Sequence, residues 1–366
     1  MIAKFLDIFE DVTKHGTKIP TNQYQSEGKY PIIDQGQEKI AGYTNQENGL
    51  FTDVPAILFG DHTRIVKYID KPCFLGADGV KLLKAKSENA NYKYLYYVLL
   101  NAKIPNTGYN RHFKWLKEVD ITLYKKEEQK NIVSLLDKIT DLINKRKQQL
   151  EKLDELVKAR FVELFGEPVI NPKSWETAPL SALILKANNG MARRGKDADG
   201  SIVLRLVELQ NGFIDYSAPN RICLNETEKK RYELVDNDFL FARVNGNPDY
   251  VGRCAVFKGI GEPVFHNDHI IRVHFDETKL NGCFTSVLLN SDYGKRQMRE
   301  QIKTSAGQYT ISQDGIGAIM TILPPMELQN QFTAFVEQTD KSKLEVKKSL
   351  EKLELLKNAL MQKYFG

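Results

Sequence analysis

The chain has 366 residues, of which 42% are hydrophobic and 27% are charged, and its formal net charge is +5. This composition is typical of a globular protein with enough apolar residues for more than one core. The sequence has no run of eighteen apolar residues and no N-terminal apolar stretch behind a charged segment, which argues against membrane insertion and secretion. We therefore expect a cytoplasmic protein of two or three domains, whose four scattered cysteines are reduced thiols.

The distribution of charge says little about function. Residues 1–120 carry 16 basic and 14 acidic side chains, and residues 167–322 carry 19 of each. Such a mild excess permits nucleic-acid binding without favouring it, because many enzymes are equally basic. Any DNA binding must therefore depend on local clusters of residues.

The strongest signal is an internal repeat with an offset of 200 residues. Residues 121–129 resemble residues 321–329, since each segment has a short β-like run, a break and a polar helix start. At the same offset, residues 150–153 and 350–353 both read Leu-Glu-Lys-Leu. These matches in register, without a gap, predict a duplicated module.

Each copy of the repeat contains a predicted long helix. No glycine or proline occurs from residue 127 to residue 165, and helix formers dominate this segment. Gly166 and Gly366 each follow a phenylalanine and stand where a C-cap glycine is expected, and Pro168 prevents continuation of the first helix. At about 1.5 Å per residue, such a helix is roughly 60 Å long.

Apolar residues recur along both helices with heptad spacing, and such a seam needs a partner helix because a lone apolar stripe is unstable in water. The economical partner is the other copy, so we expect the two helices to pair as an antiparallel coiled coil. A coiled coil for dimerisation is the alternative. The residues predicted to form the helix-pairing or subunit interface are Ile132, Leu136, Ile139, Ile143, Leu150, Leu153, Val157, Phe332, Val336, Val346, Leu350, Leu353 and Leu360.

The segments outside the helices have one order of elements. Strands are predicted over residues 54–60, 64–69 and 79–83 before a helix over 91–100, and over 201–207, 238–243 and 269–273 before a helix over 284–303. The order recurs while the residues differ, as expected for two modules with one fold and different ligands. We predict an α+β protein with a pseudo-two-fold internal repeat, in which globular α/β domains (1–122 and 167–322) alternate with helical spacers (123–166 and 323–366).

Both modules carry basic residues interleaved with amides and aromatics on predicted loops. Arginine and asparagine suit the edges of guanine and adenine, whereas lysine, serine and threonine suit phosphates. Each loop alone could be a solvated turn, but paired placement after equivalent elements favours binding. The candidate DNA-binding residues are His62, Thr63, Arg64, Asn110, Arg111, His112, Arg193, Arg194, Lys196, Arg243, Asn245, Asn247, Gln308 and Tyr309.

Two motifs approach catalytic patterns without matching them. Gly190, Gly195 and Lys196 have the spacing of a phosphate-binding loop, but Asp197 stands where serine or threonine should hold magnesium, and its carboxylate would repel phosphate. Residues 247–250, Asn-Pro-Asp-Tyr, resemble the Asn-Pro-Pro-Tyr of adenine-N6 methyltransferases, yet no glycine-rich cofactor loop accompanies them.

Three histidines could be imagined as metal ligands. His266, His269 and His274 fall on a segment predicted to be one strand, where positions 266 and 269 face opposite sides. We therefore predict no catalytic site, no metal site and no cofactor in this chain.

With two variable modules and two repeated helices, the chain resembles, over its whole length, the specificity subunit of Type I restriction-modification systems. Residues 322–329, Ile-Leu-Pro-Pro-Met-Glu-Leu-Gln, are similar to the family's sequence at the start of its conserved helix. Residues 121–129 are a diverged copy of this segment, in which Tyr124 and Lys125 replace the two prolines. Trp175 stands where second recognition domains of this family often begin.

The resemblance implies a non-catalytic subunit with two target recognition domains, each of which reads one half of a bipartite site in double-stranded DNA. The helices would set the spacer between the half-sites. It implies two modification (methyltransferase) subunits as partners, which carry S-adenosylmethionine and methylate adenine N6. It also implies restriction subunits with ATP-driven translocase and nuclease activity, which need Mg²⁺. It implies no membrane among the partners.

Two other functions are consistent with the sequence. A coiled-coil tethering protein would bind other proteins and show none of the steep salt dependence of DNA binding. An endonuclease or methyltransferase fused to recognition domains would need a cofactor or metal site, and the sequence presents none that can be assembled.

Overall fold

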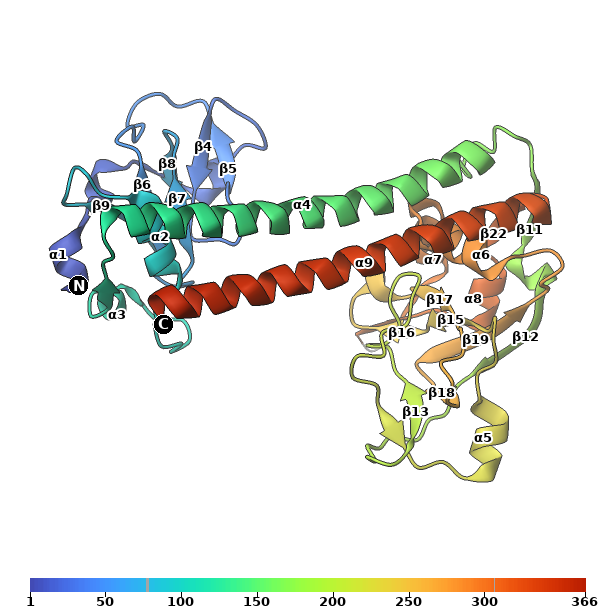
Figure 1. The fold of residues 1–366 in the computed structure, drawn as a ribbon. Helices are drawn as coiled ribbons and strands as arrows, with labels where there is room; N and C mark the ends of the chain where they lie inside the picture. The colour runs from blue at the N-terminus through green and yellow to red at the C-terminus, as the bar shows by residue number, and fades with distance from the viewer. Residues whose placement is uncertain (77–78, 306) are drawn as a thin grey trace. The chain divides into compact units, whose positions relative to one another are not determined.

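The computed structural model describes residues 1–76, 79–305 and 307–366. Two 40-residue helices, α4 (Lys126–Phe165) and α9 (Met326–Phe365), differ in their bounds by 200 residues, which confirms the internal repeat (Figure 1). The chain forms two compact units: unit 1 is Met1–Gln149 with Val346–Gly366, and unit 2 is Leu150–Glu345. Each unit contains a globular α/β module and one end of each long helix. In the described parts of the chain, no helix is sufficiently long and apolar to cross a membrane.

Unit 1 contains two four-stranded sheets. The first is antiparallel, with the order β2 (Phe9–Asp11), β9 (Val80–Ala85), β6 (Ala56–Gly60) and β7 (Val66–Ile69). The second has the order β3 (Lys18–Ile19), β8 (Phe74–Gly76), β4 (Tyr30–Ile33) and β5 (Gly42–Thr44), with β8 parallel to both neighbours. Helix α1 (Phe5–Ile8) follows strand β1 (Ile2–Lys4). Helix α2 (Tyr92–Leu100) packs on β6 and β7. Helix α3 (Phe113–Leu116) precedes β10 (Asp120–Thr122), and this strand pairs with β1.

Unit 2 repeats this arrangement. Its antiparallel sheet has the order β12 (Ile184–Asn189), β19 (Ile270–Phe275), β15 (Phe239–Ala242) and β17 (Cys254–Val256), beside a sheet of β14 (Arg221–Ile222), β13 (Ser201–Leu204) and β18 (Val264–His266). Helix α6 (Gly282–Asn290) corresponds to α2, α8 (Gln313–Gly317) to α3, and β22 (Met320–Leu323), paired with β11 (Glu176–Pro179), to β10. Unit 2 adds α5 (Glu226–Tyr232), α7 (Asp292–Gln301) and a sheet of β16 (Val244–Asn245), β21 (Gln308–Thr310) and β20 (Lys303–Ser305). The predicted α+β class with two modules of one fold is confirmed.

The single helix predicted over residues 284–303 is wrong, because two helices occupy this segment. The backbone of Ser291, between α6 and α7, is extended (ψ 170°). The Ser291 hydroxyl donates to the Leu288 carbonyl (2.6 Å), and the Asn290 amide donates to the Ser286 carbonyl (2.8 Å). These polar side chains compete with the helix backbone for its hydrogen bonds and end α6.

Each long helix ends in the core of a globular module. In unit 2, Phe165 of α4 lies against Phe284 of α6 (ring centroids 4.8 Å apart) and Phe332 of α9 (5.5 Å), and all three rings are fully buried. In unit 1 the end of α9 takes the same place, where Phe365 lies 5.6 Å from Tyr94 of α2. Such aromatic pairs contribute about 0.5–1.5 kcal/mol beyond their burial. The aromatic contacts therefore anchor the helix ends to both modules.

The helices lie antiparallel within each unit. Lys147 pairs with Glu354 (3.3 Å) in unit 1, and Asp154 pairs with Lys343 (2.8 Å) in unit 2. Every residue of the predicted seam is shielded from solvent to some degree: Ile132, Leu136, Ile139, Ile143, Val157, Phe332, Val336 and Val346 are buried, and Leu150, Leu153, Leu350, Leu353 and Leu360 are half-buried. This burial fits a helix-pairing face, and a role in binding another subunit stays a prediction.

We expect Phe165→Ala to lower the free energy of unfolding by about 3–5 kcal/mol, because the lost ring leaves a cavity between two other buried rings. Urea denaturation of the full chain measures this loss. Leu156→Ala, on the same helix at a position 47% exposed, is the matched control and should change stability little. Equal effects of the two substitutions would contradict the anchoring role of Phe165.

Candidate nucleic-acid interface

In unit 1 the candidate residues lie on two loops that the fold brings together. Residues 62–64 form the turn between β6 and β7, and residues 104–111 form the loop before α3. The His62 ring stacks on Tyr109, with centroids 4.6 Å apart and planes 7° apart, and Tyr109 is 88% exposed. The Arg64 guanidinium donates to a backbone carbonyl of the second loop (3.3 Å). The two loops therefore form one polar surface.

Gln35, which the sequence did not single out, holds the β6–β7 turn. Its side-chain oxygen accepts the backbone N–H of His62 (3.1 Å), and its carbonyl accepts the hydroxyl of Thr63 (2.7 Å). Arg64 adopts a φ of +61°, a left-handed conformation that costs a non-glycine residue free energy and persists only where its surroundings fix it. The turn is thus a constrained platform for its side chains.

The prediction that His112 contacts DNA is wrong, because this side chain is fully buried. Its backbone N–H donates to the Asp61 carbonyl (2.7 Å), and its Nδ1 lies 3.0 Å from the same oxygen. The Asp61 carboxylate, also buried, accepts the N–H of Phe113 (2.7 Å). His112 therefore ties the second loop to the turn, while its neighbours Asn110 and Arg111 are exposed.

In unit 2 the same two connections carry candidates. The connection from β15 to β17 contains β16, and the segment before α8 contains β21. These strands pair so that Asn245 lies opposite Tyr309, and the Arg243 carbonyl accepts the N–H of Ile311 (2.9 Å). Gln308, on the same strand as Tyr309, is exposed. The equivalent loops thus meet in both units, through different residues.

Arg194, Arg243 and His269 converge on Asp268. The Arg194 Nη2 lies 2.6 Å from the Asp268 carboxylate and 3.0 Å from the His269 Nε2, and the Arg243 guanidinium donates to the Asp268 carbonyl (3.3 Å). Partial burial lowers the pKa of His269, and the two arginines lower it further while Asp268 raises it. The cluster offers two guanidinium groups beside an imidazole that is neutral at pH 7, a set that suits phosphate oxygens or a guanine edge.

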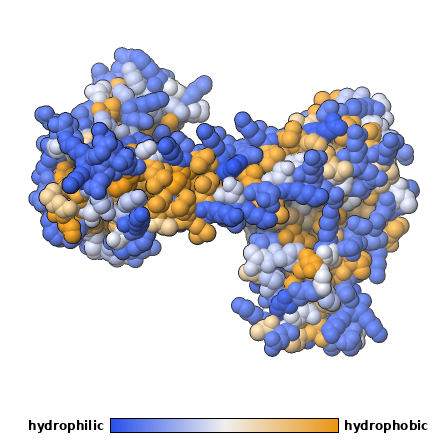
Figure 2. All heavy atoms as spheres, viewed as in Figure 1, coloured by the Kyte–Doolittle hydropathy of each residue, from blue (hydrophilic) through white to orange (hydrophobic). Residues whose placement is uncertain are grey.

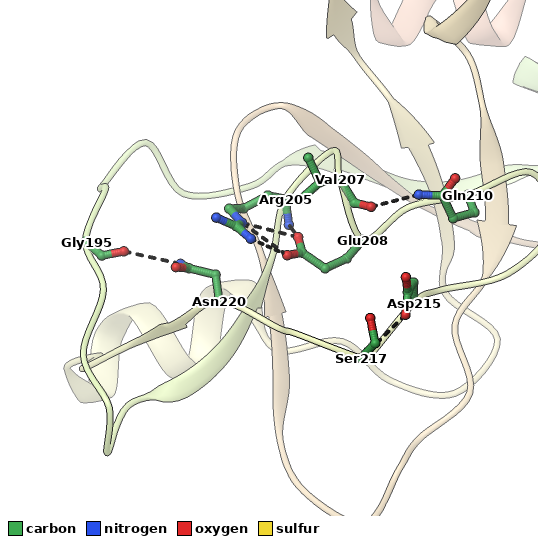
Figure 3. Close-up of polar contacts among 8 residues, drawn as sticks. All are labelled: Gly195, Arg205, Val207, Glu208, Gln210, Asp215, Ser217 and Asn220. Atoms are coloured by element: carbon green, nitrogen blue, oxygen red, sulfur yellow. Dashed lines mark hydrogen bonds and ion pairs between the residues drawn. The ribbon is translucent and has the colours of Figure 1, made fainter. Parts of the chain in front are cut away.

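Contacts beneath the basic loop of residues 192–199 fix its shape (Figure 3). The amide of Asn220, 7% exposed, donates to the Gly195 carbonyl (3.3 Å). After β13, the buried carboxylate of Glu208 accepts the backbone N–H of Arg205 (2.7 Å) and pairs with its guanidinium (2.5 Å). A buried carboxylate needs such partners, and here they fix the turn beside the loop.

This loop does not have the architecture of a phosphate-binding loop. A turn and then β13 follow it, whereas a phosphate-binding loop leads directly into a helix. The Asp197 carboxylate accepts the N–H of Cys223 (2.8 Å) and thereby shapes the loop. Arg193 turns toward Glu228 (3.3 Å), away from the Asp268 cluster, and Lys196 is exposed.

The methyltransferase-like segment is a surface turn. The Asn247 side chain accepts the N–H of Asp249 (3.0 Å), which caps a short 3₁₀ helix over Pro248–Tyr250. Asp249 pairs with Arg299 of α7 (2.5 Å). These contacts satisfy the residues of the segment within unit 2.

The three histidines lie on two strands joined by a turn rather than on the single predicted strand. His266 ends β18, His269 lies in the turn, and His274 is on β19, 3.4 Å from the buried Asp238. Within residues 1–76, 79–305 and 307–366, no group of three or more His, Cys, Asp or Glu side chains could hold a metal ion. Burial lowers the pKa of His266 to about 4, and Arg272 contributes to the shift.

The buried His266 should make stability depend on pH. Its imidazole takes a proton near pH 6.5 in the unfolded chain but only near pH 4 in the fold, so stability is full above pH 6.5 and falls as the pH drops toward 4. Between pH 7 and pH 5 the free energy of unfolding of the unmodified chain should therefore fall by about 2 kcal/mol more than that of His266→Gln. Urea denaturation at both pH values measures this difference, and the exposed His15→Gln is the control. Parallel losses in the chain and in His266→Gln would refute the assignment.

Known proteins provide a comparison for this arrangement. Residues 2–152 match the family model described as the Type I restriction modification DNA specificity domain. The chain is 28% identical over 264 residues to the StySPI specificity subunit of Salmonella potsdam, a match that covers 68% of this chain and 57% of that protein. It is 23% identical over 368 residues to the MjaVIII specificity subunit of Methanocaldococcus jannaschii, covering 92% and 85% of the two chains.

The fold is also that of a solved relative. The structure superposes on the S subunit of a Type I restriction-modification system from M. genitalium with a TM-score of 0.61 at 17% identity, over 100% of this chain and 96% of that chain. The chain spans little more than half the length of the StySPI subunit that it matches. Specificity subunits are themselves the non-catalytic components of these systems. Residues 2–152 therefore match the DNA specificity domain of Type I restriction-modification systems, and the chain is similar in sequence and in fold to the specificity subunits of these systems.

Proposed function

We propose that the chain reads a bipartite DNA target and directs partner subunits to it. The observation that carries this proposal is the presence of two units with one topology and different polar side chains on equivalent loops. Unit 1 presents the stacked His62 and Tyr109 beside Arg64, and unit 2 presents Arg194 and Arg243. Two different surfaces of one design suit two different half-sites.

The long helices would set the spacer between the half-sites. Each is continuous over 40 residues and ends in an aromatic contact with a globular module, Phe165 on Phe284 and Phe365 on Tyr94. A rigid connection between two DNA-reading elements fixes half-site spacing, as it does in dimeric repressors. This division of labour assigns sequence to the globular modules and spacing to the helices.

Two modification subunits would bind the helical region and supply the chemistry. Figure 2 shows hydrophobic residues on the surface of unit 1, and its exposed helical residues include Leu142 (45%), Leu355 (69%) and Leu356 (48%). Exposed apolar side chains on these helices would suit a protein-binding surface. The modification subunits would bring S-adenosylmethionine and methylate adenine N6 on a base flipped from the duplex, and restriction subunits would bring ATP and Mg²⁺ chemistry. The complex would act on DNA in the cytoplasm.

Arg111→Ala and Arg243→Ala should each weaken specific DNA binding by the assembled complex about 10- to 100-fold, because each removes one cationic contact of a recognition loop. The readout is adenine methylation at the target sites in cells that express the variant chain with its modification subunit. Co-purification of the subunits checks that assembly is intact.

Lys279→Ala is the control for these variants. Lys279 is exposed, its side chain pairs with Asp276, and its backbone carbonyl accepts a hydrogen bond from Gln329 of α9. It should leave methylation unchanged. Full methylation of the target by either arginine variant would show that these residues do not contact the site.

Insertion of seven residues after Leu150, together with seven after Leu350, should lengthen the spacer of the target and leave both half-sites unchanged. One heptad adds two turns to each helix, about 10 Å, and keeps the apolar seam in phase. Sequencing of methylated DNA gives half-sites and spacer together. Altered half-site sequences would refute the proposed division of labour.

A further inference from the structure

A pocket of about 430 Å³ lies in unit 1 between the end of α2, strand β10 and the end of α9. Its lining includes Asn101, Trp115, Glu118, Asp120 and Phe365. Pro105, at the start of the second recognition loop, lines one edge of it, but none of the candidate DNA-binding residues lines it, and the proposed reading of DNA does not use it. We call it the β10 pocket.

The pocket exposes hydrogen-bonding groups without described partners. Strand β10 pairs with β1, where Leu123 donates to Met1 (2.7 Å) and Phe5 donates to Val119 (3.3 Å). The alternation of an antiparallel ladder therefore turns the backbone N–H and C=O of Asp120 away from β1, toward the pocket. In the pocket wall, the Nδ2 of Asn101 is buried and lacks a hydrogen-bond partner among the described residues.

Unit 2 shows what covers the equivalent edge there. Met320 of β22 is the counterpart of Asp120, and its N–H donates to the Oε1 of Gln297 (2.8 Å). The Nε2 of Gln297 and the hydroxyl of Tyr293 donate to the Met320 carbonyl (3.0 and 3.1 Å). Both side chains belong to α7 and lie four residues apart, on one face of the helix. In unit 1, the described chain has no helix between α2 and α3, where α7 lies in unit 2.

We propose that the β10 pocket binds a helix of the modification subunit that presents an aromatic donor and a carboxamide four residues apart. The carboxamide would bond to the backbone of Asp120 as Gln297 bonds to Met320. A second copy of this chain is a poor source of such a helix, because its α7 is already bound to its own Met320. The exposed Glu118 at the rim favours a basic residue on the incoming helix. The inference rests on the proposed function, which names the modification subunit as partner.

The test titrates the full chain with the purified modification subunit of the same system by isothermal calorimetry. Ala102→Trp fills the pocket, and Glu118→Arg reverses the charge at an exposed rim position where folding is not at risk. Each should weaken the Kd about tenfold or more. Glu88→Arg, at an exposed position of unit 1 outside the pocket, is the matched control and should leave the Kd unchanged. A photo-crosslinker in place of Lys103 should join the chain to one helix of the modification subunit.

The possible outcomes separate this inference from the proposed function. Binding by the chain with an unchanged Kd for both pocket variants overturns the inference and leaves the proposed function standing. Crosslinking of position 103 to a second copy of this chain, rather than to the modification subunit, also overturns it. Failure of the unmodified chain to bind the modification subunit overturns both.

Discussion

The packing of an aromatic side chain against a globular module at the end of each long helix is the contact on which the architecture depends. Phe165 packs on Phe284 in unit 2, and Phe365 packs on Tyr94 in unit 1. Each helix begins directly after one module and ends in the core of the other unit, so the chain crosses between the units twice. Without these contacts, α4 and α9 would still pair along their apolar seams, but their C-terminal ends would not be held against the globular modules. The same interaction at both ends makes the two units equivalent in design.

A second equivalence shows how the repeat preserves geometry through sequence change. The Gln129 amide donates to the Tyr124 carbonyl (2.9 Å), and the Gln329 amide donates to the Pro324 carbonyl (2.8 Å). The first copy lacks the two prolines of the second, yet its helix starts at the equivalent residue. The glutamine, rather than the prolines, is the shared contact at the strand-to-helix junction. Gln329 additionally accepts the N–H of Asn281 at the start of α6 (2.9 Å), which ties the helix to its module.

The repeat, both helices and the glycine stop of α4 at Gly166 could be predicted because helix formers, glycine and proline act locally. The break at Ser291 could not, because it depends on the bonds that its hydroxyl and the neighbouring amide make to the backbone. The candidate site divides in the same way. Loop positions of Arg64 and Arg243 follow from composition, whereas the burial of His112 and the meeting of Asp268 with Arg194 require strand pairings between distant segments. The sequence presents His269 as a candidate metal ligand and contains no signal that points to Asp268.

In the proposed function, two units of one fold read two halves of one DNA site. Its most direct test is sequencing of N6-methyladenine in the DNA of cells that express this chain with its modification subunit, against cells that express the modification subunit alone. New methylation is expected in a two-part motif with a gap of fixed length. A stable complex that adds no methylation, or that methylates an uninterrupted motif, would contradict it.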